Sequence, residues 1–270
     1  MSLKLSCVIL TKNEEKNIER VIKSVAFCDE IIVVDDFSED KTIEEVKKFK
    51  SLKSLKVYKR RLNGDFSTQR NFGLEKAMGE WVLFLDADEE VTAELKKEII
   101  SESAGKSRDP VMQKISAFHI KRRDWFWGRE VKFGEIPRWI GLIRLVRKNS
   151  GRWEGRVHER FKVQSAGWRT RFKVKSLKNY INHYPHPTVK EFLSEVNFYS
   201  SLRAQELCEQ GKKTNILKII LYPFGKFLLT YFLKLGFLDG ASGFVYGFMM
   251  SFHSFLVRTK LYLLRRTDLK

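Results

Sequence analysis

Four short apolar runs, separated by stretches with helical spacing, fill the first hundred residues and constrain the fold more than any other feature. Each run is continuous rather than alternating with polar residues, as is typical of strands buried on both faces of a parallel sheet. The runs are residues 5–10, 31–34, 55–58 and 81–85. The intervening stretches predict helices over residues 14–25, from Thr42 and after Thr92. We therefore expect an α/β fold with a mixed, mainly parallel sheet flanked by helices.

The following segments are expected to complete this sheet and then to turn helical. Residues 115–121 and 142–146 predict strands of a mixed part of the sheet, joined by long loops rich in Arg, Trp and Gly. Thr188 and Glu191 have the spacing of a capping box, and the helix that they predict would end near Gly211.

The helical region, residues 188–270, differs in composition from the domain that we predict over residues 1–187. Leu, Phe, Tyr and Ile dominate residues 216–264, and lysines interrupt them at intervals of eight, at Lys218, Lys226 and Lys234. Because Pro223 and several glycines are expected to break this run, we predict no helix that spans a membrane. Apolar faces with flanking cations instead predict helices that lie on an anionic membrane surface. A buried helical hairpin or a dimer interface is the alternative.

The net charge of +18 is concentrated in two segments. Lys and Arg against Asp and Glu number 20 and 22 in residues 1–109, 19 and 5 in residues 110–180, and 10 and 2 in residues 212–270. Such local excesses indicate local anionic partners, namely a substrate and a membrane surface. The three cysteines are too scattered for a disulfide framework, and the first ten residues read as a strand rather than an export signal. We therefore expect a cytoplasmic protein.

Acidic residues follow two of the predicted strands. Asp35 and Asp36 end the second strand, and Asp86 and Asp88 end the fourth. Because parallel strands open onto the same edge of a sheet, the four carboxylates are expected to converge there. Their repulsion calls for a hard divalent cation, which also binds diphosphate oxygens. A lone Asp-x-Asp could instead be a solvated acidic turn.

Polar residues also follow the first strand. Thr11, Asn13 and Glu14 lie where a helix is expected to begin, and the free amides of a helix start suit nucleotide or phosphate oxygens. Asn13 or Thr11 could instead serve only as a helix cap.

Several of these motifs together resemble the family 2 glycosyltransferases of the GT-A fold. The matching segments are LSCVILTKNE (5–14), IIVVDDFSEDKT (31–42), QRN (69–71) and GEWVLFLDADEE (79–90). A looser similarity, through Trp153, residues 157–159, His183 and YFLKLGFLDG (231–240), is to the bacterial β-1,4-glucosyltransferases of the lipopolysaccharide inner core. The resemblance implies an inverting, metal-dependent enzyme that moves a hexose, expected to be glucose, from a UDP-sugar to an anionic glycan. Such an enzyme would be peripheral on the cytoplasmic face of the inner membrane.

The resemblance also implies roles for individual residues. Thr11, Glu14 and Asp35 would line the uridine pocket, with Asn13 and Asp36 in the same donor site. Arg70 would reach the base or the diphosphate, and Asp86 would meet the ribose. Asp88 would bind the metal, Mg²⁺ or Mn²⁺, and His183 or His186 could supply a further ligand.

Inverting transfer needs a base that takes the proton from the acceptor hydroxyl. Glu159 is the predicted base, because it lies in a loop segment rich in Trp, Gly and Arg; a salt bridge to Arg156 or Arg160 is the alternative. Asp124 is the reserve candidate. His158 is expected to orient the acceptor or Glu159.

Arginines and tryptophans of the basic segment are expected to contact the anionic acceptor. The arginines are Arg122, Arg123, Arg129, Arg138, Arg144, Arg147, Arg152 and Arg156. Trp125, Trp127, Trp139 and Trp153 could stack on sugars or pack in the core.

Two other readings of the sequence compete with this one. A polyprenyl-phosphate lipid or a surface polysaccharide is an alternative acceptor, and a nucleic-acid-binding protein is the alternative from another class. Four converging acids would repel a nucleic-acid backbone, so we expect no nucleic-acid partner. No Gly-x-Gly-x-x-Gly follows the first strand, which argues against a dinucleotide-dependent oxidoreductase.

Overall fold

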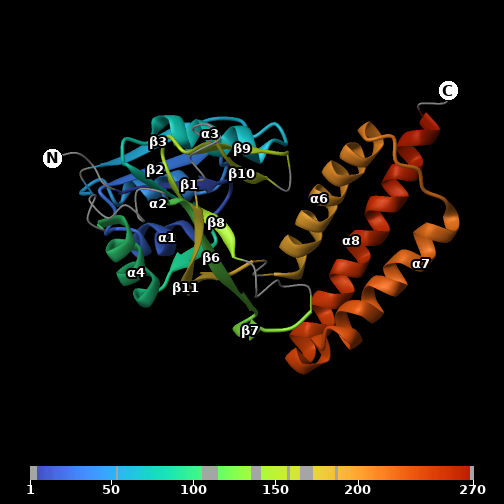
Figure 1. The fold of residues 1–270 in the computed structure, drawn as a ribbon. Helices are drawn as coiled ribbons and strands as arrows, with labels where there is room; N and C mark the ends of the chain where they lie inside the picture. Colours follow the sequence, from blue (N-terminus) through green and yellow to red (C-terminus); the bar gives the residue numbers. More distant parts are fainter. Residues whose placement is uncertain are drawn as a thin grey trace. The chain divides into compact units, whose positions relative to one another are not determined.

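The computed structural model describes residues 5–52, 54–104, 115–134, 141–156, 159–164, 173–185 and 188–267. These residues form two compact units (Figure 1). The first unit comprises Met1–Arg122 and Arg138–His183, and the second comprises Arg123–Pro137 and Tyr184–Lys270. The assignment of residues 1–187 and 188–270 as two domains stays a prediction, because compactness alone does not demonstrate independent folding.

Alternating strands and helices build the parallel half of a sheet in the first unit. In chain order they are β1 (Leu5–Thr11), α1 (Ile18–Ser24), β2 (Glu30–Asp35), α2 (Thr42–Lys47), β3 (Leu55–Lys59), α3 (Phe66–Lys76) and β4 (Trp81–Asp86). The strands lie in the order β3-β2-β1-β4, and neighbouring pairs are parallel. The four predicted strands and the predicted α/β fold are confirmed.

The other half of the sheet is mixed. Its elements in chain order are β5 (Glu89–Val91), α4 (Ala93–Ala104), β6 (Ile115–Phe126), β8 (Leu142–Arg147) and β11 (Lys173–His183). From β4 the order continues β8-β6-β11-β5, and β8 is antiparallel to both β4 and β6. A separate antiparallel pair consists of β9 (Gly151–Glu154) and β10 (Arg160–Val163).

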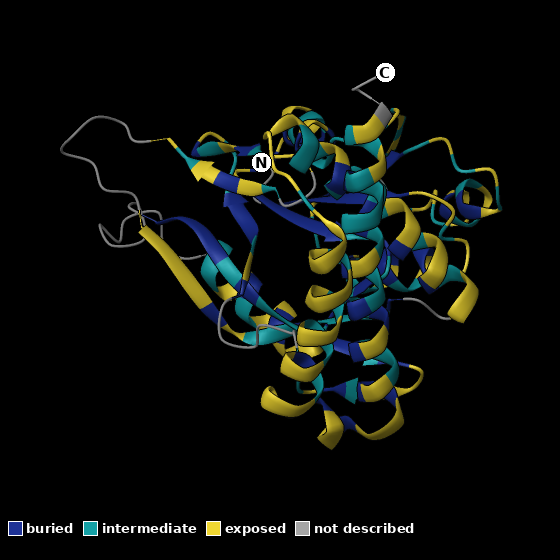
Figure 2. Cartoon of the chain, turned by 90° about the vertical axis from the view of Figure 1, so that its right-hand side faces the viewer, coloured by how far each residue is buried: buried dark blue, intermediate teal, exposed yellow. Residues whose placement is uncertain are grey.

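Apolar side chains cover both faces of the central strands, which explains the continuous apolar runs. On one face, Cys7 and Ile9 of β1 belong to a core cluster that includes Ile22 of α1. On the other face, Val8 belongs to a second cluster that includes Leu74 of α3. Figure 2 draws most of these strands in dark blue, as buried.

Two details of the helices near β1 differ from the prediction. The first helix begins at Ile18 rather than at Glu14. Its N-cap is Asn17, whose side chain makes no capping hydrogen bond. The second helix begins at Thr42 as predicted, but the Thr42 hydroxyl accepts from the Glu14 amide at 2.7 Å instead of capping its own helix. Both starts are therefore shaped by the contact between these two loops.

The second unit is mainly helical. Its strand β7 (Arg129–Val131) pairs with the end of β6. Its helices are α6 (Val189–Glu209), α7 (Ile216–Phe227), the π-helix η1 (Leu228–Leu233), the 3-10 helix η2 (Gly236–Asp239) and α8 (Gly240–Thr267). The predicted capping box of Thr188 and Glu191 is present at the start of α6. The core of this unit includes Phe126, Phe192 and Met249.

The expectation that Pro223 and Gly225 break the apolar run after residue 216 is wrong, whereas the run does end at Lys234, before Gly236 and the left-handed Leu235. Pro223 lies inside α7, and the helical path continues through η1, so that Ile216–Leu233 forms 18 residues with a mean hydropathy of 1.5. By length and composition alone this segment could cross a membrane, and only 6% of it is buried. Proline removes one helical hydrogen bond, while α7 is held by packing along α8 and by the Ser251 hydroxyl, which donates to the Pro223 carbonyl at 2.5 Å.

Candidate active site

The carboxyl ends of three parallel strands meet at one edge of the sheet in the first unit. Thr11 of β1 is paired in register with Asp35 of β2, and Leu10 is paired with Asp86 of β4. The structure thus brings together the strand ends on which the sequence predicted a donor site. Open α/β sheets bind their ligands at this edge.

The loop residues after β1 and β2 hold one another. The Asn13 amide donates to the Ser38 hydroxyl at 2.9 Å, and the Asn13 side-chain oxygen accepts from the Glu39 amide at 2.8 Å. Asn13 is therefore not a helix cap; its side chain joins the two loops. The Ser38 amide in turn donates to the buried Asp35 carboxylate at 3.2 Å.

The remaining predicted donor residues of these loops are also placed. The Glu14 carboxylate accepts from the Asn17 side chain at 2.7 Å. The Asp36 carboxylate accepts from Lys12 and from the Leu62 amide, both at 2.9 Å. The Thr11 hydroxyl is buried, and it has no hydrogen-bond partner within the described part of the chain. A buried polar group without a partner is costly, so this hydroxyl is suited to a bound ligand.

Two arginines converge on Asp86 at the end of β4. Arg70 of α3 donates to Asp86 Oδ1 at 2.9 Å, and Arg144 of β8 donates to Asp86 Oδ2 at 2.7 Å. Burial raises the pKa of Asp86, but the two guanidinium groups outweigh burial and hold this pKa far below its ordinary range. Asp86 is therefore ionised at neutral pH.

Arg144 also binds a second carboxylate, Glu89 of β5. Arg144 Nη2 donates to Glu89 Oε1 at 2.7 Å, and the Asp86 amide donates to Glu89 Oε2 at 3.0 Å. Burial and the nearby Asp86 raise the pKa of Glu89 despite Arg144. Glu89 thus fixes the turn that carries Asp86 and Asp88. The sequence pattern did not predict this role for Glu89. The sequence did hold a signal for this role, because Arg144 is the one charged residue in the apolar strand pattern of residues 142–146 and a buried arginine needs carboxylate partners.

His183 lies beside Asp88. Its Nε2 is 3.0 Å from Asp88 Oδ2, because β11 pairs with β5 and His183 lies opposite Glu89 in that register. Burial raises the pKa of Asp88, but His183 outweighs it and lowers the pKa overall. His186 lies outside the described residues.

These two side chains form an incomplete metal site. No group of three or more His, Cys, Asp or Glu side chains with metal-site geometry occurs among the described residues. A carboxylate and an imidazole are acceptable ligands for Mn²⁺ and leave room for diphosphate oxygens. The residues therefore fit a metal that a nucleotide diphosphate helps to hold.

Arg70 is positioned by α3 and by an aromatic stack. A Cβ atom at Gly73 would lie 2.4 Å from Val8 Cγ1, so this glycine lets α3 approach β1 closely. The Arg70 guanidinium lies 5.2 Å from the ring centre of Trp153, which packs against Phe84 at 5.2 Å. Trp153 is buried, so its role is to support Arg70 and the core rather than to present a face for sugar stacking.

Glu159, the predicted base, belongs to the same cluster. Its Oε1 accepts from Arg70 Nε at 2.8 Å. Arg70, the partner that the structure shows for Glu159, is 89 residues away in the chain, and the sequence did not offer it as a partner. His158 lies outside the described residues, so its role stays a prediction.

The structure corrects several expectations for the basic segment. Arg144 is buried between two carboxylates and is not free for an acceptor, and Arg147 pairs with Glu80 at 2.9 Å. Asp124, the reserve candidate for the base, is a buried residue of β6 in the second unit, where β6 pairs with β7. Arg138 and Trp139 lie outside the described residues.

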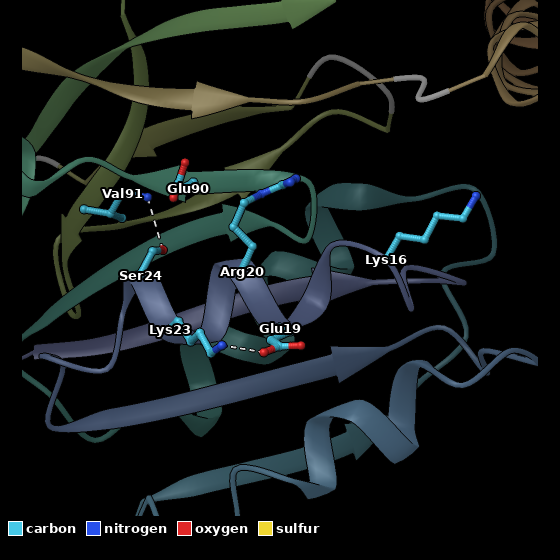
Figure 3. A pocket seen from close by; sticks show the side chains of 7 residues that line it. All are labelled: Lys16, Glu19, Arg20, Lys23, Ser24, Glu90 and Val91. Atoms are coloured by element: carbon cyan, nitrogen blue, oxygen red, sulfur yellow. Dashed lines mark hydrogen bonds and ion pairs between the residues drawn. The ribbon is translucent and has the colours of Figure 1, made fainter. Parts of the chain in front are cut away.

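A separate surface pocket of about 490 Å³ lies over α1 (Figure 3). Its lining residues are Lys16, Glu19, Arg20, Lys23, Ser24, Glu90 and Val91. It includes none of the arginines or aspartates of the strand-end cluster. We do not assign the donor to it.

Comparison with known proteins identifies the family. The model of glycosyl transferase family 2 matches residues 6–176. This chain belongs to glycosyltransferase family 2. The glycosyltransferase has the GT-A fold, uses a nucleotide sugar as donor, and is an enzyme of the EC 2.4 group. This membership sets aside the nucleic-acid-binding alternative as the main activity.

Two relatives match the glycosyltransferase over nearly its whole length. An uncharacterised glycosyltransferase of Rickettsia typhi is 30% identical over 269 residues, which cover 96% of this chain and 86% of the relative. The lipopolysaccharide core biosynthesis glycosyltransferase LpsC of Rhizobium meliloti is 27% identical, and the match covers 96% of this chain and 92% of LpsC.

Two solved structures share the fold of the glycosyltransferase. Mannosyltransferase PcManGT of Pyrobaculum calidifontis, in complex with GDP-Man and Mn²⁺, has a TM-score of 0.52 at 12% identity, over 97% of this chain and 87% of that one. S. aureus TarS 1–349, in complex with UDP-GlcNAc, has a TM-score of 0.50 at 17% identity, over 98% and 92%.

Proposed function

We propose that this glycosyltransferase moves a hexose, with glucose as the first candidate, from a UDP-sugar to an anionic membrane-bound glycan such as the lipopolysaccharide inner core. The observation that carries the proposal is the cluster at the end of β4, in which Asp88 and His183 lie beside Asp86 and Arg70. The similarity to LpsC, a lipopolysaccharide core biosynthesis glycosyltransferase, supports a core glycan as the acceptor. The complex of TarS with UDP-GlcNAc supports a UDP-sugar as the donor.

In this proposal the loops after β1 and β2 hold the nucleoside. Thr11, Glu14 and Asp35 line the uridine pocket, with Asn13 and Asp36 beside them. The buried Thr11 hydroxyl and Arg70 Nη1, both without a hydrogen-bond partner among the described residues, are suited to donor atoms. Arg70 reaches the diphosphate and Asp86 the ribose.

Asp88 and His183 would hold a divalent cation, Mg²⁺ or Mn²⁺. When bound, the metal would neutralise the charge that develops on the departing UDP. The Asp88 carboxylate is ionised, as a ligand must be, and a bound metal would displace the proton that His183 Nε2 shares with it.

Glu159 is the proposed base. Its carboxylate would take the proton of the acceptor hydroxyl while the anomeric carbon acquires oxocarbenium character. In the protein without substrate, this carboxylate accepts from Arg70. A diphosphate that engages Arg70 would free Glu159 for the acceptor, and His158 would orient either of them.

The acceptor and location are inferred from charge and relatives. Lipopolysaccharide core glycans carry carboxylates or phosphates, which match the basic segment. An enzyme that acts on them would work at the cytoplasmic face of the inner membrane. A polyprenyl-phosphate or surface-polysaccharide acceptor is the alternative, and it would share the donor site.

A UDP-release assay over a panel of sugar nucleotides, with and without a chelator, tests the donor and the metal together. We expect slow UDP release from UDP-glucose that stops on chelation, and faster release when inner-core glycolipid is added. A preference for a GDP-sugar, or release that the chelator leaves unchanged, would overturn the donor or the metal assignment.

A further inference from the structure

A groove runs between the helices of the second unit. Figure 1 draws α8 between α6 and α7, and the groove that these helices line has a volume of about 710 Å³. Its apolar lining residues are Leu207, Leu221, Leu229, Met250 and Val257, and its basic lining residues are Arg203, Lys226, His253 and Arg258. No Asp or Glu lines it among the described residues. The groove therefore combines an apolar wall with four basic side chains, of which Arg203 is paired with Glu206 at 2.5 Å.

The segment that forms most of this groove carries positive charge with almost no acid. Between Gly211 and Thr267 the cations are Lys212, Lys213, Lys218, Lys226, Lys234, Arg258, Lys260, Arg265 and Arg266. Asp239 is the one acidic residue of that stretch, and its buried carboxylate accepts from the amides of Lys132 and Phe133. The accessible charge of this stretch is therefore positive.

Arg258 is the cation most clearly placed for an anion. Its Nη1 donates to the carbonyl and the hydroxyl of Ser254, and its guanidinium lies 3.9 Å from the ring centre of Tyr222. All three partners are neutral. Burial lowers the pKa of Arg258, as expected for a guanidinium that no carboxylate stabilises. An anion beside it would supply the missing charge.

The helices beside the groove expose much apolar surface. No residue of α7 is buried, and Ile216, Leu217 and Phe224 are each 63% exposed. The end of η1 adds Leu233, which is 77% exposed. Contiguous apolar surface of this kind marks a membrane or a protein interface. Because the stretch from Gly211 to Thr267 carries nine cations and only the buried Asp239, a surface of anionic lipid is the better match.

We propose that the groove binds the phosphate of an anionic phospholipid, with Lys226 and Arg258 facing the phosphate and the exposed side of α7 buried among the acyl chains. The apolar wall accommodates the start of an acyl chain. Lys226 is the eleventh of the 18 apolar-segment residues, where a spanning helix would bury its charge at the bilayer centre. A helix that lies along the interface keeps this charge at the level of the headgroups. The proposal is independent of which sugar the enzyme transfers.

Co-sedimentation of the full chain with vesicles tests the site. We expect binding to phosphatidylcholine vesicles that contain phosphatidylglycerol and little binding to phosphatidylcholine alone. The test pair is Lys226→Gln and Lys218→Gln, which remove the same charge from the same helix, although only Lys226 lines the groove. Loss of one cation near an anionic surface weakens binding about fivefold. We expect Lys226→Gln to weaken vesicle binding by more than this factor and Lys218→Gln to weaken it by about this factor. Equal losses of binding in the two variants would overturn the proposed phosphate site in the groove.

A soluble short-chain phosphatidylglycerol, used below its micelle concentration, separates a site from general attraction. We expect saturable binding of this lipid by calorimetry, weakened in Lys226→Gln, and much weaker binding of inorganic phosphate. Absence of saturable binding would overturn the proposal. A dimer that lipid does not dissociate would show instead that a second copy covers this face. UDP release without lipid should be unchanged in both variants, so failure of the lipid site is distinguishable from failure of the proposed transferase.

Discussion

At the scale of single residues, the strand-end cluster that we propose as the donor site is a set of charges that neutralise one another. Arg70 connects Asp86 and Glu159, and Arg144 connects Asp86 and Glu89. Because both arginines and Glu89 are buried, removal of one of their partners leaves a charge uncompensated. A diphosphate that binds there as proposed would have to compete with Asp86 and Glu159 for Arg70.

Asp88→Asn tests the metal. The substitution keeps the size of the side chain and removes the charge that a divalent cation needs, so UDP release at saturating Mn²⁺ should fall on the order of a hundredfold or more. Glu90→Gln is the matched control, because Glu90 lies two residues later and lines the separate pocket of Figure 3. Unchanged turnover in Asp88→Asn, with the melting temperature preserved, would remove the metal assignment.

Glu159→Gln tests the base. The amide can still accept from Arg70 but cannot take a proton, so kcat should fall by about 10²- to 10⁴-fold while UDP affinity changes little. Glu154→Gln on β9 serves as the control, since that carboxylate pairs with Lys162 at 3.3 Å. A loss confined to donor affinity would mean that Glu159 only positions Arg70.

The sequence predicted the aspartates at the strand ends, but it did not predict that Arg144 and Glu89 join them. Asp35, Asp86 and Asp88 could be predicted because strand ends of a parallel sheet share an edge, a rule that needs no register. Arg144 could not, because its contact with Asp86 depends on how β8 pairs with β4, and local patterns do not encode antiparallel pairing between distant strands. Glu89 was missed for the same reason, since only Arg144 distinguishes it from a solvated acid.

At the scale of elements, the buried Glu30 joins neighbouring strands of the sheet through its hydrogen bonds. Glu30 at the start of β2 accepts from the Ser6 hydroxyl at 2.6 Å, from the Met78 amide at 2.8 Å and from Lys56 at 2.8 Å. It therefore joins β1, β2, β3 and the loop before β4. Burial raises the pKa of Glu30, but these three partners outweigh it and lower the pKa overall.

Glu30→Gln should lower the free energy of unfolding by about 1–2 kcal/mol at pH 7. A depressed folded-state pKa contributes stability that is present above the unfolded value near 4.5 and is lost as the pH falls through the folded pKa. The variant should therefore lose less stability than the wild type between pH 7 and pH 3, as measured by urea unfolding. Glu45→Gln is the control, because Glu45 pairs with Lys48 near the surface. Parallel pH curves for wild type and Glu30→Gln would contradict the assignment.

Element positions followed from the sequence where patterns were local. The parallel strands and the cap of α6 were predicted correctly, since apolar runs and capping spacing are local signals. The start of α1 and the continuity of α7 were not, because each depends on a tertiary contact. The Glu14 amide bonds Thr42, and the Pro223 carbonyl accepts from Ser251 of α8. Gly236 and Gly240 lie at the predicted break before α8, whereas Gly243 lies within α8 and allows close packing there.

At the scale of the whole molecule, two compact units with separate cores divide the chain. The strand-end cluster belongs to the first unit and the groove to the second. Separate cores imply that damage to one unit need not abolish binding in the other.

Gly243→Ala tests this separation. A Cβ atom there would lie 2.0 Å from the Gly236 carbonyl oxygen, so η2 must move away from α8, at a cost of about 3 kcal/mol. Calorimetry should show a less stable protein that still binds UDP with unchanged affinity. Gly225→Ala on α7 is the control, since its Cβ would meet nothing within 4 Å and alanine favours helix by about 0.5–1 kcal/mol. Loss of UDP binding in Gly243→Ala would show that the units act as one.

The exposed apolar side of α7 bears on which acceptor concentration would set the rate of this enzyme. If the enzyme adsorbs to a membrane through that helix, as proposed, it would search for its acceptor in two dimensions, and its rate would follow the surface density of the proposed glycolipid acceptor. Diluting the acceptor with neutral lipid in the same vesicles would slow turnover even at constant total acceptor.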